Sequence, residues 1–171
     1  MINELTKIMP DIQFTPGERF AWSPAERKIT YTESQIEADG RWALLHETGH
    51  ALLGHLSYKS DIELLKMEVA AWEKAKELAK RLGLEISEEH IQQCLDSYRD
   101  WLHRRSTCPA CGTNTLQNDL SSTYGCFNCH ARWQVSPSRF CRSYRTRKSE
   151  TEFVMLWKNR PSKLDERSFK L

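Results

Sequence analysis

The chain has 171 residues, enough for one ordinary domain or for a small domain followed by a minidomain. Charged residues make up 28% of it and hydrophobic residues 39%, and no apolar run approaches the roughly 18 residues that cross a bilayer, so a membrane protein and a fully disordered chain are disfavoured. The first residues lack a continuous apolar stretch with a small-residue cleavage site, so we expect no signal peptide, a cytoplasmic location and six reduced cysteines.

Charge is distributed unevenly along the chain. Residues 1–129 hold 14 Lys and Arg against 19 Asp and Glu, whereas residues 130–171 hold 11 against 4. An acidic body followed by a basic tail indicates parts with different partners. We expect three regions: a body over residues 1–105, a cysteine-rich segment with a basic extension over 106–148, and a partly docked tail over 149–171.

The body is predicted to contain a hairpin followed by three helices. Phe20–Trp22 and Ile29–Thr32 have strand patterns on either side of a polar stretch. Apolar residues then recur at helical spacing in three segments, from Gly40 to about residue 56, from Ser60 or Asp61 to about Gly83, and from Ser87 to Arg105. The expected fold class is α+β, a small sheet with three helices.

The first predicted helix carries an HExxH motif, from His46 through Glu47 to His50. A spacing of four places the two imidazoles on one helix face, where both can bind one metal ion. A zinc ion held in this way lowers the pKa of its bound water to about 7, and Glu47 would take the proton of that water and pass it to the leaving amine. The alternative is a chance match on an ordinary helix whose core histidines are hydrogen-bonded.

A catalytic zinc ion usually has a third protein ligand. His55 is near in sequence, but it is out of register with the last His of an HExxHxxGxxH motif. On the next predicted helix, Glu68 lies in the middle of the apolar stripe, where a bare carboxylate is costly. Asp61 shares that angle, but capping of the helix start explains it. The carboxylates that project to the polar side are Glu63, Glu73 and Glu77. We therefore predict Glu68 as the third ligand.

The stretch from Trp42 to His55 resembles the core of the ImmA/IrrE metallopeptidase family. Glu68, followed four residues later by Trp72, occupies the places of that family's ligand glutamate and aromatic residue. The similarity covers roughly residues 15–83 and implies a zincin-like fold with a gluzincin-like third ligand. It also implies a protein substrate, often a DNA-bound repressor. The zinc ligands and the catalytic acid/base that it implies are the residues already singled out: His46, His50, Glu68 and Glu47.

Two CxxC pairs, Cys108 with Cys111 and Cys126 with Cys129, are separated by 14 residues. Each pair suits a tight turn whose two thiolates point at one ion, so together they predict a tetrahedral Cys₄ zinc site resembling a zinc ribbon. Four thiolates leave no open position, which makes this zinc structural. The alternatives are two disulfides or free thiols, or replacement of one ligand by His130. The remaining candidates are interpreted as core or surface residues: Cys94, Cys141, His90 and His103.

Basic residues interleaved with aromatic residues follow the second CxxC pair. This pattern is typical of a surface that grips phosphates and stacks bases, but a solvated face or a site for an acidic protein would have the same composition. The basic residues are Arg132, Arg139, Arg142, Arg145, Arg147 and Lys148, and the aromatic ones are Trp133, Phe140 and Tyr144. Further on, the apolar segment Phe153–Trp157 is expected to dock as a strand or short helix.

These patterns together predict a zinc-dependent endopeptidase with two zinc ions, one catalytic and one structural. Its partners would be a protein substrate and, through the basic tail, a nucleic acid; no membrane partner is expected. One alternative is a SprT-like protease acting on DNA-associated proteins, although such proteases use a third His soon after HExxH. The other is a non-enzymatic zinc-ribbon protein that binds nucleic acid.

Overall fold

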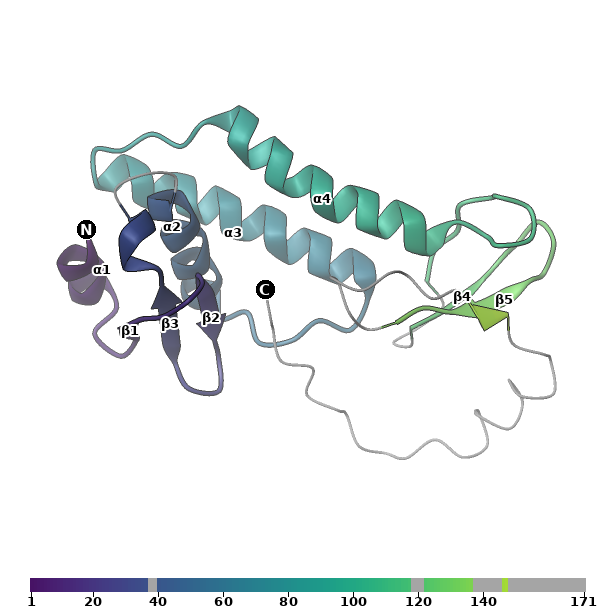
Figure 1. The fold of residues 1–171 in the computed structure, drawn as a ribbon, viewed down its shortest axis with the longest axis horizontal. Helices are drawn as coiled ribbons and strands as arrows, with labels where there is room; N and C mark the ends of the chain where they lie inside the picture. Colours follow the sequence, from purple (N-terminus) through teal and green to yellow (C-terminus); the bar gives the residue numbers. More distant parts are fainter. Residues whose placement is uncertain (37–39, 118–121, 137–145, 148–171) are drawn as a thin grey trace. The chain divides into compact units, whose positions relative to one another are not determined.

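The computed structural model describes residues 1–36, 40–117, 122–136 and 146–147, and its fold is α+β, as expected (Figure 1). These residues form two compact units. The first contains residues 1–58 and 65–95, and the second contains residues 59–64 and 96–136 with a short strand at 146–147. None of the described helices has the length and apolar character that a membrane span requires.

The sheet of the first unit has three short strands in the order β1-β3-β2. β2 (Ala21–Ser23) and β3 (Lys28–Tyr31) are antiparallel, with Trp22 opposite Ile29, which confirms the predicted hairpin. β1 (Gln13–Pro16) pairs in parallel with β3 on its other side. Neither β1 nor the N-terminal helix α1 (Ile2–Ile8) was predicted. β2 is therefore an edge strand, and both β2 and β3 lie against the motif-bearing helix.

Three longer helices follow a 3₁₀ turn at Glu33–Gln35, and they confirm the three helices predicted from the apolar periodicity. They are α2 (Gly40–Leu52), α3 (Asp61–Arg81) and α4 (Glu88–Ser106). α2 ends four residues earlier than predicted, because Gly54 adopts a left-handed φ of 64° and the His55 N–H donates to the His50 carbonyl. The apolar residues beyond Leu52 thus belong to a loop and are exposed.

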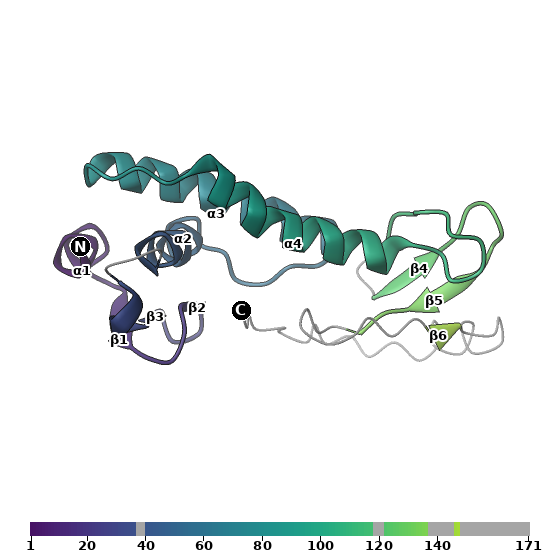
Figure 2. The ribbon, with the colours of Figure 1, turned by 45° about the horizontal axis from the view of Figure 1, so that its top comes forward.

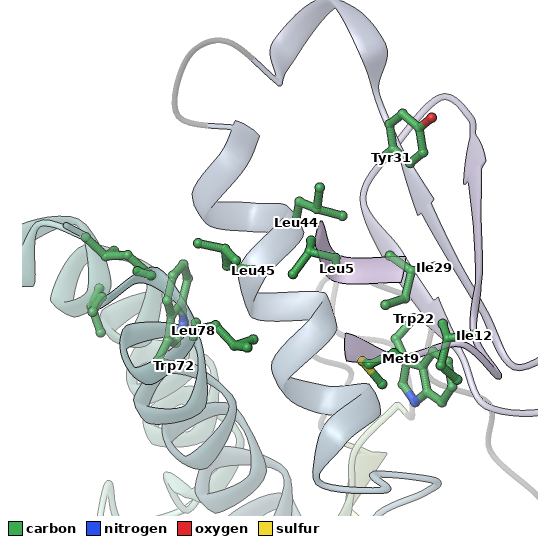
Figure 3. Packing of buried hydrophobic residues seen from close by; sticks show 14 of the residues in the cluster. Leu5, Met9, Ile12, Trp22, Ile29, Tyr31, Leu44, Leu45, Trp72 and Leu78 are labelled. Carbon is green, nitrogen blue, oxygen red and sulfur yellow. The ribbon is translucent and has the colours of Figure 1, made fainter. Parts of the chain in front are cut away.

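α2 lies in the middle of the core of the first unit, which explains why all its residues from Leu44 to His50 are buried. Figure 3 shows Leu44 directed towards Leu5 and the sheet, while Leu45 is directed towards Trp72 and Leu78 on α3. A helix covered on both sides has no solvent face along this stretch. Polar side chains on it must therefore find partners inside the protein.

The second unit contains the paired cysteines and a sheet in the order β4-β5-β6, drawn side by side in Figure 2. β4 (Thr123–Gly125) and β5 (Arg132–Gln134) are antiparallel, and β6 (Thr146–Arg147) adds to β5. Tyr124 and Trp133 are stacked with ring centroids 5.5 Å apart, and both are fully buried. The assignment of Trp133 to a base-stacking surface is therefore wrong, since this ring lies in the hydrophobic core of the second unit.

A buried ion pair holds the start of α3 in the second unit. Arg105 donates to Asp61 through Nε at 2.7 Å and Nη2 at 3.2 Å, and the Tyr124 hydroxyl donates to the same carboxylate. The position of Asp61 at the helix start predicts a capping role for its carboxylate, and this prediction is wrong. The cap is Ser60, whose Oγ accepts from the Glu63 N–H at 3.2 Å.

Several predictions concern residues outside the described part of the chain. They include most of the basic and aromatic tail residues, one cysteine and the apolar segment: Arg139, Phe140, Cys141, Arg142, Tyr144, Arg145, Lys148 and Phe153–Trp157. Among the described tail residues, Arg132 is exposed on β5.

Candidate metal centres

The structure brings His46, His50 and Glu68 together in the first unit, and all three side chains are buried. The Nε2 atoms of the two histidines lie 3.1 Å apart. Oε2 of Glu68 lies 3.1 Å from Nε2 of His46, and its Oε1 lies 3.7 Å from Nε2 of His50. Two histidines from α2 and one carboxylate from α3 thus converge on one point.

These distances fit a tetrahedrally coordinated zinc ion. Zinc bonds of about 2.0–2.1 Å would place neighbouring ligand atoms about 3.3–3.4 Å apart, between the separations observed. Oε1 of Glu68 is buried and accepts no hydrogen bond from any described residue. A buried carboxylate oxygen without a donor is unfavourable unless a cation completes its environment, so the residues fit the metal that the sequence predicts.

Gly49 allows the two helices to approach closely enough for this convergence. A Cβ atom at Gly49 would lie 2.5 Å from the backbone carbonyl oxygen of Ala71 on α3, a distance that real Cβ atoms do not adopt. Any larger residue would push α2 away from α3 and separate Glu68 from the histidines. The glycine of the HETGH sequence is therefore a packing requirement.

The electrostatics of the cluster favour an ionised Glu68. Burial alone would raise its pKa, but the hydrogen bond with His46 and the charges of His46 and His50 outweigh burial and lower the pKa well below its usual range. The carboxylate therefore carries a negative charge inside the protein. Together with two imidazole nitrogens it makes a donor set that suits a divalent transition metal.

Glu47 is buried on α2 beside the cluster without being part of it. Its Oε2 accepts a hydrogen bond of 2.8 Å from the backbone N–H of Trp22 on β2. Burial raises the pKa of Glu47, although the neighbouring histidines and the Trp22 N–H act in the opposite direction. Edge strand β2 thus positions a carboxylate whose basicity is increased by its surroundings.

The two histidines are held by different neighbours. The ring of His46 stacks on Trp72 with centroids 4.3 Å apart, whereas Nδ1 of His50 lies 2.8 Å from Nδ1 of His55. Burial lowers the pKa of His55 to about 4, which keeps this imidazole neutral. The ring of His90 meets that of Trp72 edge-on, with centroids 5.6 Å apart, and His90 is outside the metal-binding group.

The second unit brings the four predicted cysteines together. Sγ of Cys108 lies 3.5 Å from Sγ of Cys129, and Sγ of Cys111 lies 3.5 Å from Sγ of Cys126. Zinc–sulfur bonds of about 2.3 Å would place tetrahedral thiolates about 3.8 Å apart, so the cluster fits one zinc ion. The thiols are free rather than joined in disulfides, and His130 is not in the group.

Sequence reasoning missed the roles of Trp22 and Gly49 at the first site, and it considered His55 as a possible metal ligand, not as a neighbour of His50. Trp22 contacts Glu47, which is 25 residues away in the sequence, and His55 contacts His50, which is 5 residues away. Gly49 sets how closely α2 and α3 approach each other. The glycine between the two motif residues offered a signal, because a helix interior disfavours Gly unless close packing requires it. The backbone contact of Trp22 left no trace in the sequence, since any residue except proline provides an N–H.

Comparisons with protein-family models, with curated proteins and with solved structures found no significant match to this chain.

Proposed function

We propose that this protein is a zinc-dependent endopeptidase of zincin-like architecture, with zinc held by His46, His50 and Glu68 and with Glu47 as general base and acid. The observation that carries the proposal is the arrangement around α2. Metal-binding atoms of three buried residues converge, one carboxylate oxygen among them accepts no hydrogen bond from the described chain, and a fourth residue, the acidic Glu47, is fixed next to them. A purely structural cluster of histidines does not require that fourth residue.

When bound, zinc would polarise the scissile carbonyl and lower the pKa of a water molecule in the site. The chain's own contribution to the chemistry comes from Glu47. Its carboxylate takes a proton from the attacking water and then delivers it to the nitrogen of the leaving amine. The Trp22 N–H holds the carboxylate during both transfers, and burial raises its pKa, which makes the carboxylate a stronger base.

The resemblance to the ImmA/IrrE family supports a protein as the substrate, and a DNA-bound repressor is the specific candidate that it suggests. The zinc ribbon has four thiolate ligands and no open position, so its zinc would be structural. We assign it to recognition of the substrate or of the nucleic acid to which the substrate is bound.

The test compares the wild type with Glu47→Gln, an isosteric change that removes the base but no metal ligand. Both full-length proteins are incubated with a peptide library of broad sequence coverage, and new N-termini are identified by mass spectrometry. We expect cleavage by the wild type, loss of at least about 10²-fold in Glu47→Gln, and two zinc ions per chain in both. Equal cleavage patterns in the two proteins, or none in either, would contradict the proposal and favour a binding protein.

A further inference from the structure

The two ring nitrogens of His50 face different partners. Nε2 lies 3.1 Å from Nε2 of His46 and 3.7 Å from Oε1 of Glu68, so it belongs to the metal-binding group. Nδ1 lies 2.8 Å from Nδ1 of His55, at hydrogen-bond distance. One side of the ring therefore faces the metal position and the opposite side faces another imidazole.

Among the described residues, His46 has no contact of this kind, so the contact with His55 is specific to His50. Nδ1 of His46 is buried and has no hydrogen-bond partner within the part of the chain that the structure describes. Its ring is oriented by stacking on Trp72 at a centroid distance of 4.3 Å. A change at His55 would thus act on one of the two histidine ligands and leave the support of the other in place.

The backbone of His55 is fixed independently of its side chain. Its N–H donates to the His50 carbonyl at 3.1 Å, and its own carbonyl accepts from the Trp22 indole N–H at 2.9 Å. The imidazole is therefore presented to His50 by the turn that ends α2 and by a residue of β2. Substituting the side chain removes the ring contact and leaves both backbone bonds.

We propose that His55 is a positioning residue that holds His50 in the tautomer whose Nε2 can bind the metal. The inference rests on the zinc site of the proposed function. An imidazole that binds a metal through Nε2 carries its proton on Nδ1, and in His50 that N–H donates to Nδ1 of His55. The bond fixes the ring rotation and increases the basicity of the ligand nitrogen, as partners of metal-binding histidines do in general.

The experiment measures zinc affinity rather than turnover. The full-length protein is stripped of metal and titrated with Zn²⁺ against a fluorescent chelator, and native mass spectrometry counts the ions per chain. Glu68→Ala identifies which of the two binding constants belongs to the His–Glu site. The variants are His55→Ala, His55→Asn, which retains an acceptor oxygen near the place of Nδ1, and His103→Ala, which removes an exposed imidazole on α4 as a control.

We expect His55→Ala to weaken zinc at the His–Glu site by about 10- to 100-fold and to leave the Cys₄ site unchanged. His55→Asn should recover most of that loss, and His103→Ala should match the wild type. Nitrogen-15 NMR of the zinc-loaded wild type should show a protonated Nδ1 on His50 that is protected from exchange, and this protection should disappear in His55→Ala.

The outcomes separate the two proposals. Wild-type and His55→Ala proteins with equal zinc affinity, or a His50 that is metallated through Nδ1, would overturn the role of His55 alone. A wild type that binds zinc only at the four cysteines would overturn both this role and the proposed function. A zinc-loaded protein that is sensitive to His55→Ala but cleaves no peptide would support the positioning role while the endopeptidase proposal fails.

Discussion

The ion pair between Asp61 and Arg105 offers a direct test of how the second unit is stabilised. Arg105 is 1% exposed and Asp61 is 3% exposed, and the guanidinium also lies 4.4 Å from the ring centroid of Trp101. Arg105→Met replaces the charged side chain with an apolar one of similar length. It removes both hydrogen bonds to Asp61 and leaves that carboxylate buried with the Tyr124 hydroxyl as a donor.

The expected destabilisation of Arg105→Met is about 3–5 kcal/mol, because the substitution strands a buried negative charge. Domains of this size have a total stability of only about 5–15 kcal/mol, so the second unit would be close to unfolding. Burial raises the pKa of Tyr124, with the Asp61 carboxylate adding to the effect, so the phenol stays protonated and remains a donor. One neutral donor does not replace a bidentate guanidinium.

The sign of a second substitution distinguishes this reasoning from simple loss of packing. Adding Asp61→Asn to Arg105→Met removes the stranded charge, so the double variant should be more stable than Arg105→Met alone. Urea unfolding of the zinc-loaded proteins, followed by circular dichroism, measures these differences. The control is Arg99→Met on the same helix, where the pair with Asp96 is solvent-exposed and the expected change is within about 0.5 kcal/mol.

Two results would refute the argument. One is a loss below about 1 kcal/mol for Arg105→Met, which would mean that water or a rearranged side chain compensates Asp61. The other is a double variant less stable than Arg105→Met, which would mean that Asp61 is stabilised by contacts other than the guanidinium.

Three further predictions concern single substitutions. Gly49→Ala should destabilise the protein by about 1–3 kcal/mol and weaken zinc binding at the His–Glu site, because the new methyl group would overlap the Ala71 carbonyl. Thermal unfolding and zinc titration measure the two effects, and an unchanged zinc affinity would contradict the prediction. Cys126→Ser should reduce bound zinc from two ions to one in native mass spectrometry, and loss of both ions would count against separate sites. Trp22→Phe should lower the free energy of unfolding by about 1 kcal/mol, since it removes the indole donor to the His55 carbonyl and keeps the backbone donor to Glu47. Urea unfolding measures this change, and a neutral effect would mean that the indole hydrogen bond contributes nothing to stability.

The sequence by itself indicated which residues come together at both candidate metal sites. His46 and His50 share a helix face because of their spacing alone, and each CxxC pair closes within a single turn. Glu68 could be identified as the third metal ligand because a carboxylate in the apolar stripe of a helix becomes buried on packing, and a buried charge without a partner is costly. These inferences succeeded because they depend on local geometry and on the price of burying charge, which hardly vary with the rest of the fold.

The tertiary structure alone decided the contacts between distant segments. Asp61 and Arg105 are 44 residues apart, and helical position suggested a cap instead of a buried ion pair. The parallel pairing of β1 with β3 uses backbone groups only, and the donor to the Glu47 carboxylate is the backbone N–H of Trp22, which every residue except proline carries. No residue type therefore marks these contacts in advance. Such contacts depend on how the elements pack, and periodicity within one element contains no information about its neighbours.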